Sequence, residues 1–200
     1  MSPYDGAVRA ALLAHKERGR LGLVAPLGDA LAWGLAALEA DPTTGPLLRG
    51  ALRAGVLVVV PVPSTAAATR ARGHDPVLRM TRRATGLVLP GARVERLLRT
   101  ARGVVDSAGR GTDARWADVA SRHAVTRRLR AGSVAILTDD LVTTGASLVA
   151  ARRLLEAHGV PVLGAAVVAA TRRHRHPADS DTPQAGPSRA SRLDPHAEAG

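Results

Sequence analysis

The sequence contains no cysteine and no phenylalanine, and its aromatic residues are one tyrosine and two tryptophans. Without cysteine the chain cannot form a disulfide, a Cys-ligated structural zinc site or a thiol nucleophile. With so few aromatic rings, we do not expect a surface that stacks nucleic-acid bases. The core must be aliphatic, built mainly from Ala, Val and Leu. The absence of cysteine fits a reducing compartment, and we expect a cytoplasmic protein.

Long uninterrupted apolar runs are also missing. Asp5, Arg9 and Lys16 interrupt the apolar residues near the start, so we expect no signal peptide. We expect no membrane partner, because no window reaches the ~18–20 uninterrupted apolar residues of a membrane span. The 200 residues fit one domain, which we assign to residues 1–170. Residues 171–200 are rich in Arg, His, Pro and Ser, and we expect a disordered tail because they cannot bury apolar surface.

Acidic residues are too few to balance the basic ones, which leaves a formal net charge of +11. Lys16 is the only lysine, and the other basic residues that carry this charge are arginines. A composition rich in Arg and Ala is typical of a GC-rich genome, whereas a basic surface attracts anions such as DNA. The charge by itself is compatible with both interpretations.

Apolar strands alternate with helical segments along the chain. Residues 56–60, 134–137 and 162–169 are continuous apolar runs, as expected for strands buried on both faces. Helical spacing of apolar residues occurs in residues 7–17, 26–39 and 146–158, and residues 64–86 read as helical with a break near Gly73. We therefore predict an α/β fold with a central, mostly parallel sheet flanked by helices.

The most informative segment is residues 134–148, which read VAILTDDLVTTGASL. An apolar strand leads into two carboxylates, a small hydroxyl-rich turn and a helix. The turn and the helix start expose N–H groups that can hold a phosphate. We expect this phosphate cradle to consist of Val142, Thr143, Thr144, Gly145, Ala146 and Ser147.

Two adjacent carboxylates precede this cradle. Asp139 and Asp140 cannot hold the phosphate, but as paired acceptors they suit a vicinal diol. A phosphate and a diol on one ligand indicate a ribose 5-phosphate. We expect both carboxylates to bind the ribose and to be the catalytic residues. Side chains alternate along a strand, so both can reach one sugar only where the strand breaks into the turn.

The same segment resembles the phosphoribosyl pyrophosphate motif of type I phosphoribosyltransferases: an apolar strand, two acidic residues, two apolar residues and a TTG-type turn. Residues 4–22 (YDGAVRAALLAHKERGRLG) and 58–80 (VVVPVPSTAAATRARGHDPVLRM) resemble conserved parts of the ComF family. That family combines an early strand, a Pro-x-Pro turn and an RGxx segment, here Arg72 to Asp75. The resemblance implies a type I phosphoribosyltransferase fold, similar to amidophosphoribosyltransferases, without the four-cysteine zinc module that usually begins ComF proteins.

The resemblance also implies further ligand contacts. The loop after the early strand is expected to bind pyrophosphate, with an ordinary helix-capping turn as the alternative. This loop consists of Pro61, Val62, Pro63, Ser64 and Thr65. Arg72, Arg99 and Arg102 are implied anion contacts, the last two in a lid over residues 99–113. Lys16 and Arg70 could each meet a pyrophosphate or substrate anion, but a solvated surface charge is the favoured interpretation for either one. Mg²⁺ is implied as the cofactor, held by substrate oxygens and water with no direct protein ligand.

Two functions stay open. The chain could be a transferase that moves a phosphoribosyl group between phosphoribosyl pyrophosphate or a nucleotide and an unknown base or amine. Alternatively, it could be a non-catalytic nucleotide-binding module in DNA uptake, since ComF relatives are associated with competence and a helicase-type partner. DNA binding and a homodimer are also left open, because a fold does not determine a function.

Overall fold

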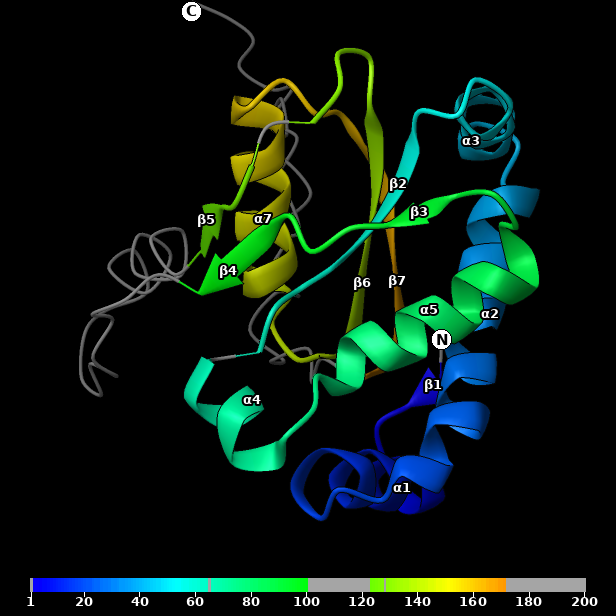
Figure 1. The fold of residues 1–200 in the computed structure, drawn as a ribbon. Helices are drawn as coiled ribbons and strands as arrows, with labels where there is room; N and C mark the ends of the chain where they lie inside the picture. Colours follow the sequence, from blue (N-terminus) through cyan, green and yellow to red (C-terminus); the bar gives the residue numbers. More distant parts are fainter. Residues whose placement is uncertain (1, 65, 101–122, 128, 172–200) are drawn as a thin grey trace, which may run out of the picture.

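The computed structural model describes residues 2–64, 66–100, 123–127 and 129–171. In this part of the chain, one parallel sheet has the strand order β1-β7-β6-β2-β3. Its strands are β1 (Ser2–Pro3), β2 (Leu57–Pro61), β3 (Arg93–Val94), β6 (Val134–Val142) and β7 (Val162–Ala170). A separate antiparallel pair joins β4 (Leu98–Thr100) to β5 (His123–Val125). The predicted α/β class with a central parallel sheet is confirmed (Figure 1).

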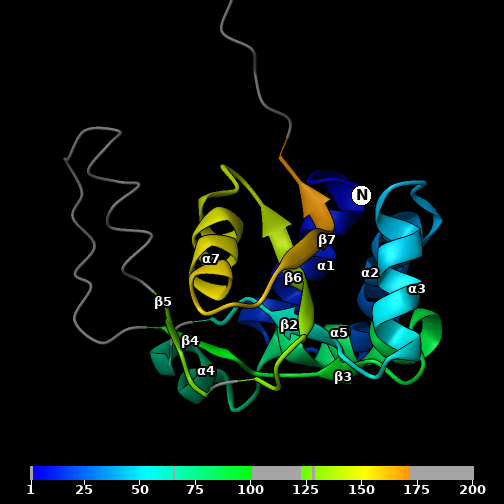
Figure 2. The same cartoon turned by 90° about the horizontal axis from the view of Figure 1, so that it is seen from above.

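Helices cover both faces of the sheet and form three layers with it (Figure 2). One face carries α1 (Gly6–Glu17), α2 (Val24–Ala40, after a 3-10 turn at Leu21–Leu23), α3 (Thr44–Arg53) and α5 (Pro76–Val88). The other carries α7 (Ala146–Ala157) together with β4 and β5. The short helix α4 (Ala66–Arg72) lies near β4.

Strand β2 shows why an unbroken apolar run forms a central strand. Leu57 and Val59 face the core on the α2 and α5 side, while Val58 and Val60 face the core on the α7 side. All four are fully buried, because alternate side chains of a strand covered on both faces enter two different cores. Both cores are aliphatic among the described residues, as the composition predicts.

Helix α3 lies outside the helical segments predicted from apolar spacing, and it contains Gly45 and Pro46, two residue types that commonly end a helix. The helix begins at Thr44, so Pro46 lies in its first turn, where a missing N–H costs nothing. Asp41 Oδ1 accepts hydrogen bonds from the N–H groups of Thr43 and Thr44, at 3.0 and 2.7 Å. A Cβ on Gly45 would lie 2.2 Å from the carbonyl oxygen of Glu39, so only glycine fits there.

One stretch, Leu21–Ala40, is long and apolar enough to cross a membrane by length and composition. Asp29 and Glu39 interrupt the stretch, so it is not the uninterrupted apolar run that the sequence was expected to lack. In the fold, α2 packs against both α5 and β7, and Leu31 and Leu35 are fully buried. A helix with two packed sides needs apolar residues on more than one face, which accounts for its composition.

Candidate functional site

The carboxyl ends of β2 and β6 lie side by side at one edge of the sheet. The two strands pair in parallel, with Pro61 opposite Thr138, and the Val62 N–H donates to the Thr138 carbonyl at 2.8 Å. From β2 the chain crosses over to β3, and from β6 it crosses to β7 on the opposite side. The strand order therefore reverses between β2 and β6. Ligands of open α/β sheets bind outside the strand ends at such a reversal.

The turn after β6 has the local geometry of an anion cradle. Gly145 has φ +79° and is the N-cap residue of α7, so the N-cap residue itself has no side chain that could accept a hydrogen bond. The Ala146 N–H donates to Thr144 Oγ1 at 3.3 Å. The next N–H groups of this turn lack intrahelical acceptors, as at every helix start. A hollow of about 40 Å³ is lined by Asp139 and residues 141–148, which brings together Asp139 and all six predicted cradle residues.

The positive φ of Gly145 explains why glycine occupies this position. A Cβ there would meet only Val142 Cγ1, at 4.0 Å, which is an ordinary contact. The requirement is therefore conformational rather than steric, because residues with a side chain rarely adopt this backbone angle.

Asp139 and Asp140 have different neighbours, although their side chains are close enough for Asp140 to raise the pKa of Asp139. Strand β6 continues to Val142 instead of ending at residue 137, and Leu141 and Val142 still pair with β7. The pairing with β7 therefore runs past both carboxylates. Asp139 lines the turn hollow, whereas Asp140 points to α1.

Asp139 is half-buried, and its pKa is raised well above the ordinary aspartate value. Burial is the largest cause, and the negative charge of Asp140 is the second. The Asp140 N–H donates to Asp139 Oδ1 at 2.8 Å and partly offsets this rise, because it stabilises the ionised form. A carboxyl with a raised pKa beside a hollow is a candidate for binding or proton transfer.

Asp140 forms an ion pair with Lys16. Its Oδ2 lies 3.0 Å from Lys16 Nζ, and the side chains are 6% and 37% exposed. The neighbouring His15 is fully buried against His74, with ring centroids 5.6 Å apart, and its Nδ1–H donates to the Arg20 carbonyl at 3.1 Å. The end of α1 is thus anchored, and Lys16 is not the solvated charge that was expected. Its status as the only lysine in an arginine-rich chain was a signal that the prediction did not use.

The predicted pyrophosphate loop begins within β2, since Pro61 is the last residue of the strand and Val62 is buried beneath α7 and β4. Pro63 and Ser64 follow at the edge of the sheet and line a second hollow. Thr65 and Arg102 lie outside the described residues, as do most of the predicted lid and the tail. Arg72 lies against α1, where its Nη1 is 3.8 Å from Glu17 Oε1.

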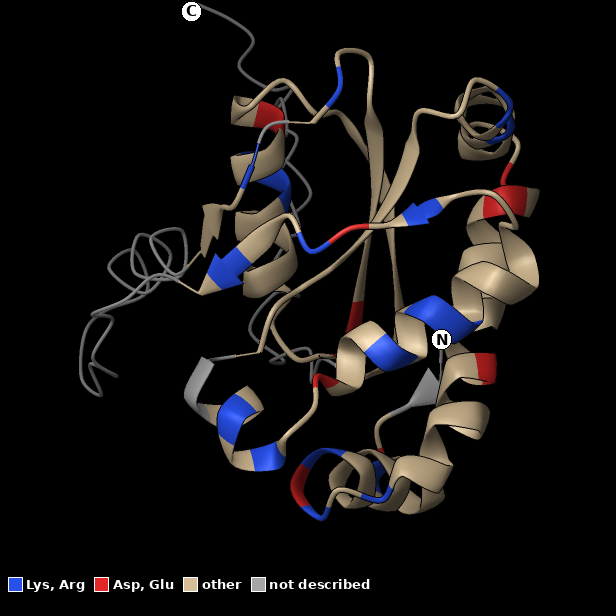
Figure 3. Cartoon of the chain, in the orientation of Figure 1, with Lys and Arg blue, Asp and Glu red and all other residues tan. Residues whose placement is uncertain are grey.

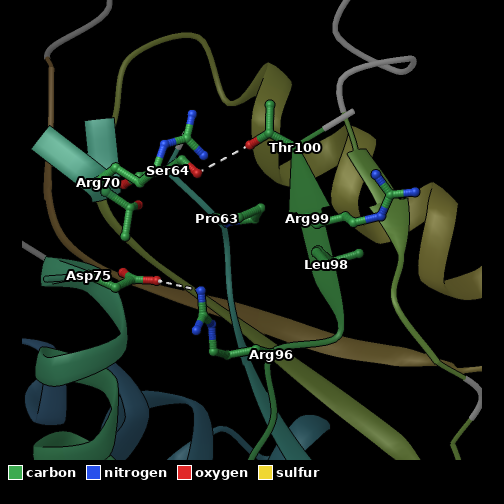
Figure 4. A pocket seen from close by; sticks show the side chains of 9 residues that line it. Pro63, Ser64, Arg70, Asp75, Arg96, Leu98, Arg99 and Thr100 are labelled. Atoms are coloured by element: carbon green, nitrogen blue, oxygen red, sulfur yellow. Dashed lines mark hydrogen bonds and ion pairs between the residues drawn. The ribbon is translucent and has the colours of Figure 1, made fainter. Parts of the chain in front are cut away.

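The second hollow is a cavity of about 1000 Å³ between α4, the start of α5 and β4 (Figure 4). Arg70, Arg96 and Arg99 line it, together with Asp75. Asp75 Oδ1 accepts from the Leu78 N–H at 3.1 Å, and its Oδ2 lies 4.0 Å from Arg96 Nη2. Sequence reasoning predicted Arg99 as an anion contact and considered Arg70 as one only as the less favoured alternative. It missed Arg96, because nothing in the local pattern shows that α4 and β4 meet.

These features define an α/β protein whose candidate binding site lies at the carboxyl edge of a parallel sheet, with a small turn hollow and a large cationic cavity. No family model matches the chain, and no curated protein matches it either.

Proposed function

We propose that this chain is a ComF-type protein with the type I phosphoribosyltransferase fold, which binds phosphoribosyl pyrophosphate or a ribose 5-phosphate nucleotide. In this proposal it transfers the phosphoribosyl group to or from a base or an amine. The observation that carries the proposal is the meeting of the turn 142–147, Asp139 and the loop 61–64 at the strand-order reversal between β2 and β6.

Each part of the ligand has a matching part of the site. The 5-phosphate would bind the N–H groups of the turn that Gly145 shapes. The ribose hydroxyls would donate to Asp139, which lines the same hollow. The pyrophosphate would lie toward Pro63 and Ser64, at the adjoining strand end. Asp140 takes a supporting role, because its charge is already matched by Lys16.

The reaction replaces one bond to the anomeric carbon with another. The bond from this carbon to the pyrophosphate oxygen breaks, and the electron pair leaves with pyrophosphate. The acceptor nitrogen supplies the electron pair of the new bond and loses a proton. The protein contributes by holding both reactants in position and by excluding water.

Mg²⁺ fits this scheme as a substrate-bound ion. Among the described residues no group of three or more His, Cys, Asp or Glu side chains could hold a metal. Asp139 is the carboxylate that faces the turn hollow, and through a water molecule it could reach an ion carried in by the substrate. When bound, Mg²⁺ supplies charge neutralisation to the leaving pyrophosphate.

Calorimetry with phosphoribosyl pyrophosphate and Mg²⁺ tests the proposal. We expect Asp139→Asn to weaken binding by about 1.5–3 kcal/mol, because one charge-assisted acceptor is lost. Asp29→Asn is the matched control, since Asp29 is a carboxylate on α2 that pairs with Arg83 and lies outside both hollows. Wild-type protein that shows no binding of phosphoribosyl pyrophosphate would overturn the proposal.

A nucleotide-binding module in DNA uptake is the second candidate. The observation that favours it is the cluster of basic residues on α4 and β4 near the sheet edge (Figure 3). Pyrophosphate release in the presence of a panel of bases and amines would identify a transferase. Salt-dependent DNA binding with phosphoribosyl pyrophosphate bound but never consumed would identify the module.

A further inference from the structure

The cavity beside the end of β2 is much larger than the turn hollow. Its volume is about 1000 Å³, against about 40 Å³ for the hollow around Gly145. Pockets that enclose whole small molecules have volumes of roughly 300–1,000 Å³. The turn hollow can hold one small group, whereas the cavity has room for a second molecule beside a pyrophosphate.

The charge of the cavity indicates what that molecule carries. Among the described lining residues of the cavity, three are arginines and the acidic one is Asp75. Asp75 is already engaged by Arg96 and by the N–H of Leu78. Arg70 and Arg99 form no ion pair with any residue that the structure describes. The cavity therefore has an excess of positive charge that an anion can neutralise.

The walls of the cavity are tied together without a ligand. Thr100 Oγ1 donates to the Ser64 carbonyl at 3.2 Å, which joins β4 to the loop after β2. Arg96 reaches from the segment before β4 to Asp75 at the start of α5. Arg70 extends from α4 toward Ser64, whereas the Arg99 side chain leaves β4 on the side away from Arg70 (Figure 4). A pocket held in this way needs little ordering when a ligand enters.

The kind of anion follows from the chemistry of the lining. Guanidinium groups bind carboxylate and phosphate through paired hydrogen bonds. Sites for single-stranded nucleic acid add aromatic rings on which bases stack, and no lining residue described here is aromatic. The lining therefore favours a small anionic molecule over a DNA strand.

We propose that this cavity binds the acceptor of the transfer reaction, and that the acceptor is a nitrogen base or an amine bearing a carboxylate or phosphate group. Arg70 is its main contact and Arg99 the second. This inference rests on the proposed function for the role of acceptor, while anion binding in the cavity stands independently of it.

Calorimetry with matched pairs of small molecules tests the inference on the full chain. The pairs are orotate and uracil, nicotinate and nicotinamide, and anthranilate and aniline, each with the same ring and only one member anionic. In at least one pair, we expect the anionic member to bind about tenfold more tightly or better, because it gains charge-assisted hydrogen bonds.

Variants assign this binding to the cavity. Arg70→Met should weaken the anionic member about tenfold, and Arg99→Met should weaken it less. Arg153→Met is the matched control, because Arg153 is an exposed arginine on α7 outside the cavity and its replacement changes the net charge equally. Affinity that falls as much in Arg153→Met as in Arg70→Met would overturn the inference.

Competition experiments test whether the cavity binds an acceptor, a pyrophosphate or a DNA strand. The anionic probe should still bind when inorganic pyrophosphate is saturating. The inference is wrong if pyrophosphate excludes every probe, if no pair shows a preference for its anionic member, or if a single-stranded oligonucleotide binds through Arg70 and the probes do not displace it. The protein could fail to bind phosphoribosyl pyrophosphate while the affinity for the anionic probe still depends on Arg70. That result would refute the proposed function and leave the assignment of anion binding to the cavity intact.

Discussion

The two adjacent carboxylates at the carboxyl edge of the sheet, Asp139 and Asp140, have different surroundings. Asp139 opens into the turn hollow beside Gly145 and no described basic residue lines that hollow. Asp140 is closed off by its ion pair with Lys16. Thr138 lies two residues before Asp140 in β6, and its buried hydroxyl lies 2.8 Å from the buried hydroxyl of Thr81. Adjacent residues of one motif thus have different surroundings, since Asp139 lines a hollow and Asp140 is paired with Lys16.

This difference shows how two adjacent carboxylates can have different electrostatic environments. Two like charges side by side repel, and Asp140 contributes to the raised pKa of Asp139. Lys16 lowers the pKa of Asp139 and holds the charge of Asp140 in place. One carboxylate can then face a ligand while the other remains balanced. If this account is right, changes around the two carboxylates should affect different measurements.

The largest expected effect is at Gly145, in the hollow that Asp139 lines. Gly145→Val should abolish detectable binding of phosphoribosyl pyrophosphate, a loss of about 100-fold or more, because a β-branched residue at φ +79° distorts the turn. Gly132→Val is the matched control, since Gly132 has φ +78° and lies at the other end of β6. It carries the same strain and should retain binding.

Calorimetry on variants with wild-type circular dichroism measures both changes. Equal loss of binding in the Gly145 and Gly132 variants would show that general strain, and not the turn, governs binding.

The next effect is at Lys16, the partner of Asp140. Lys16→Met should lower the free energy of unfolding by about 2 kcal/mol, because it leaves the carboxylate of Asp140 buried without a partner; a fully buried pair would cost more. The double variant Lys16→Met, Asp140→Asn should recover most of this loss, since no buried charge remains. Urea unfolding of the four proteins in this cycle provides the coupling. A double variant as unstable as Lys16→Met would contradict the pairing.

A smaller effect is expected at Thr138. The Thr81 hydroxyl donates to the Val77 carbonyl at 2.8 Å, so Thr138 must donate to Thr81. Thr138→Val removes this donor and leaves Thr81 bonded, at a cost of about 1 kcal/mol of unfolding free energy. Thr81→Val should cost more, because the buried Thr138 hydroxyl then lacks an acceptor. Neither variant should change the affinity for phosphoribosyl pyrophosphate, and a shift in that affinity would break the separation of the two environments.

The last prediction concerns the pH dependence of stability. Because the pKa of Asp139 is raised in the folded state, folded protein holds more protons than unfolded protein between the ordinary aspartate pKa, about 4, and the raised value. The contribution of Asp139 therefore becomes less favourable as pH rises through this window. Asp139→Asn should gain stability relative to wild type as pH rises, and the two should converge near the lower limit.

Asp29→Asn should change the pH dependence of stability in the opposite direction. The hydrogen bond from Arg83 lowers the pKa of Asp29, so this carboxylate stabilises the fold above its ordinary pKa and loses that contribution as pH falls. Urea unfolding from about pH 2.5, below the ordinary aspartate pKa, to pH 8 compares both variants with wild type. Curves of Asp139→Asn and wild type with the same slope would contradict the environment assigned to Asp139.

The sequence alone determined the elements whose pattern is local. Unbroken Val-rich runs predicted β2 and β7, and helical periodicity predicted α1, α2 and α7 with ends within two residues or so. The turn 142–147 could also be predicted, because its anion-binding geometry depends on neighbours along the chain and on a glycine at positive φ.

The tertiary structure decided what depends on distant segments. Pairing with β7 extends β6 past its apolar residues to Val142, so both Asp139 and Asp140 lie within the strand. Packing of α1 brings Lys16 to Asp140 across more than 120 positions of sequence, and the meeting of α4 with β4 builds the arginine cavity. Side-chain direction at a strand end depends on whether a neighbouring strand continues the ladder of hydrogen bonds, and no local pattern contains that information.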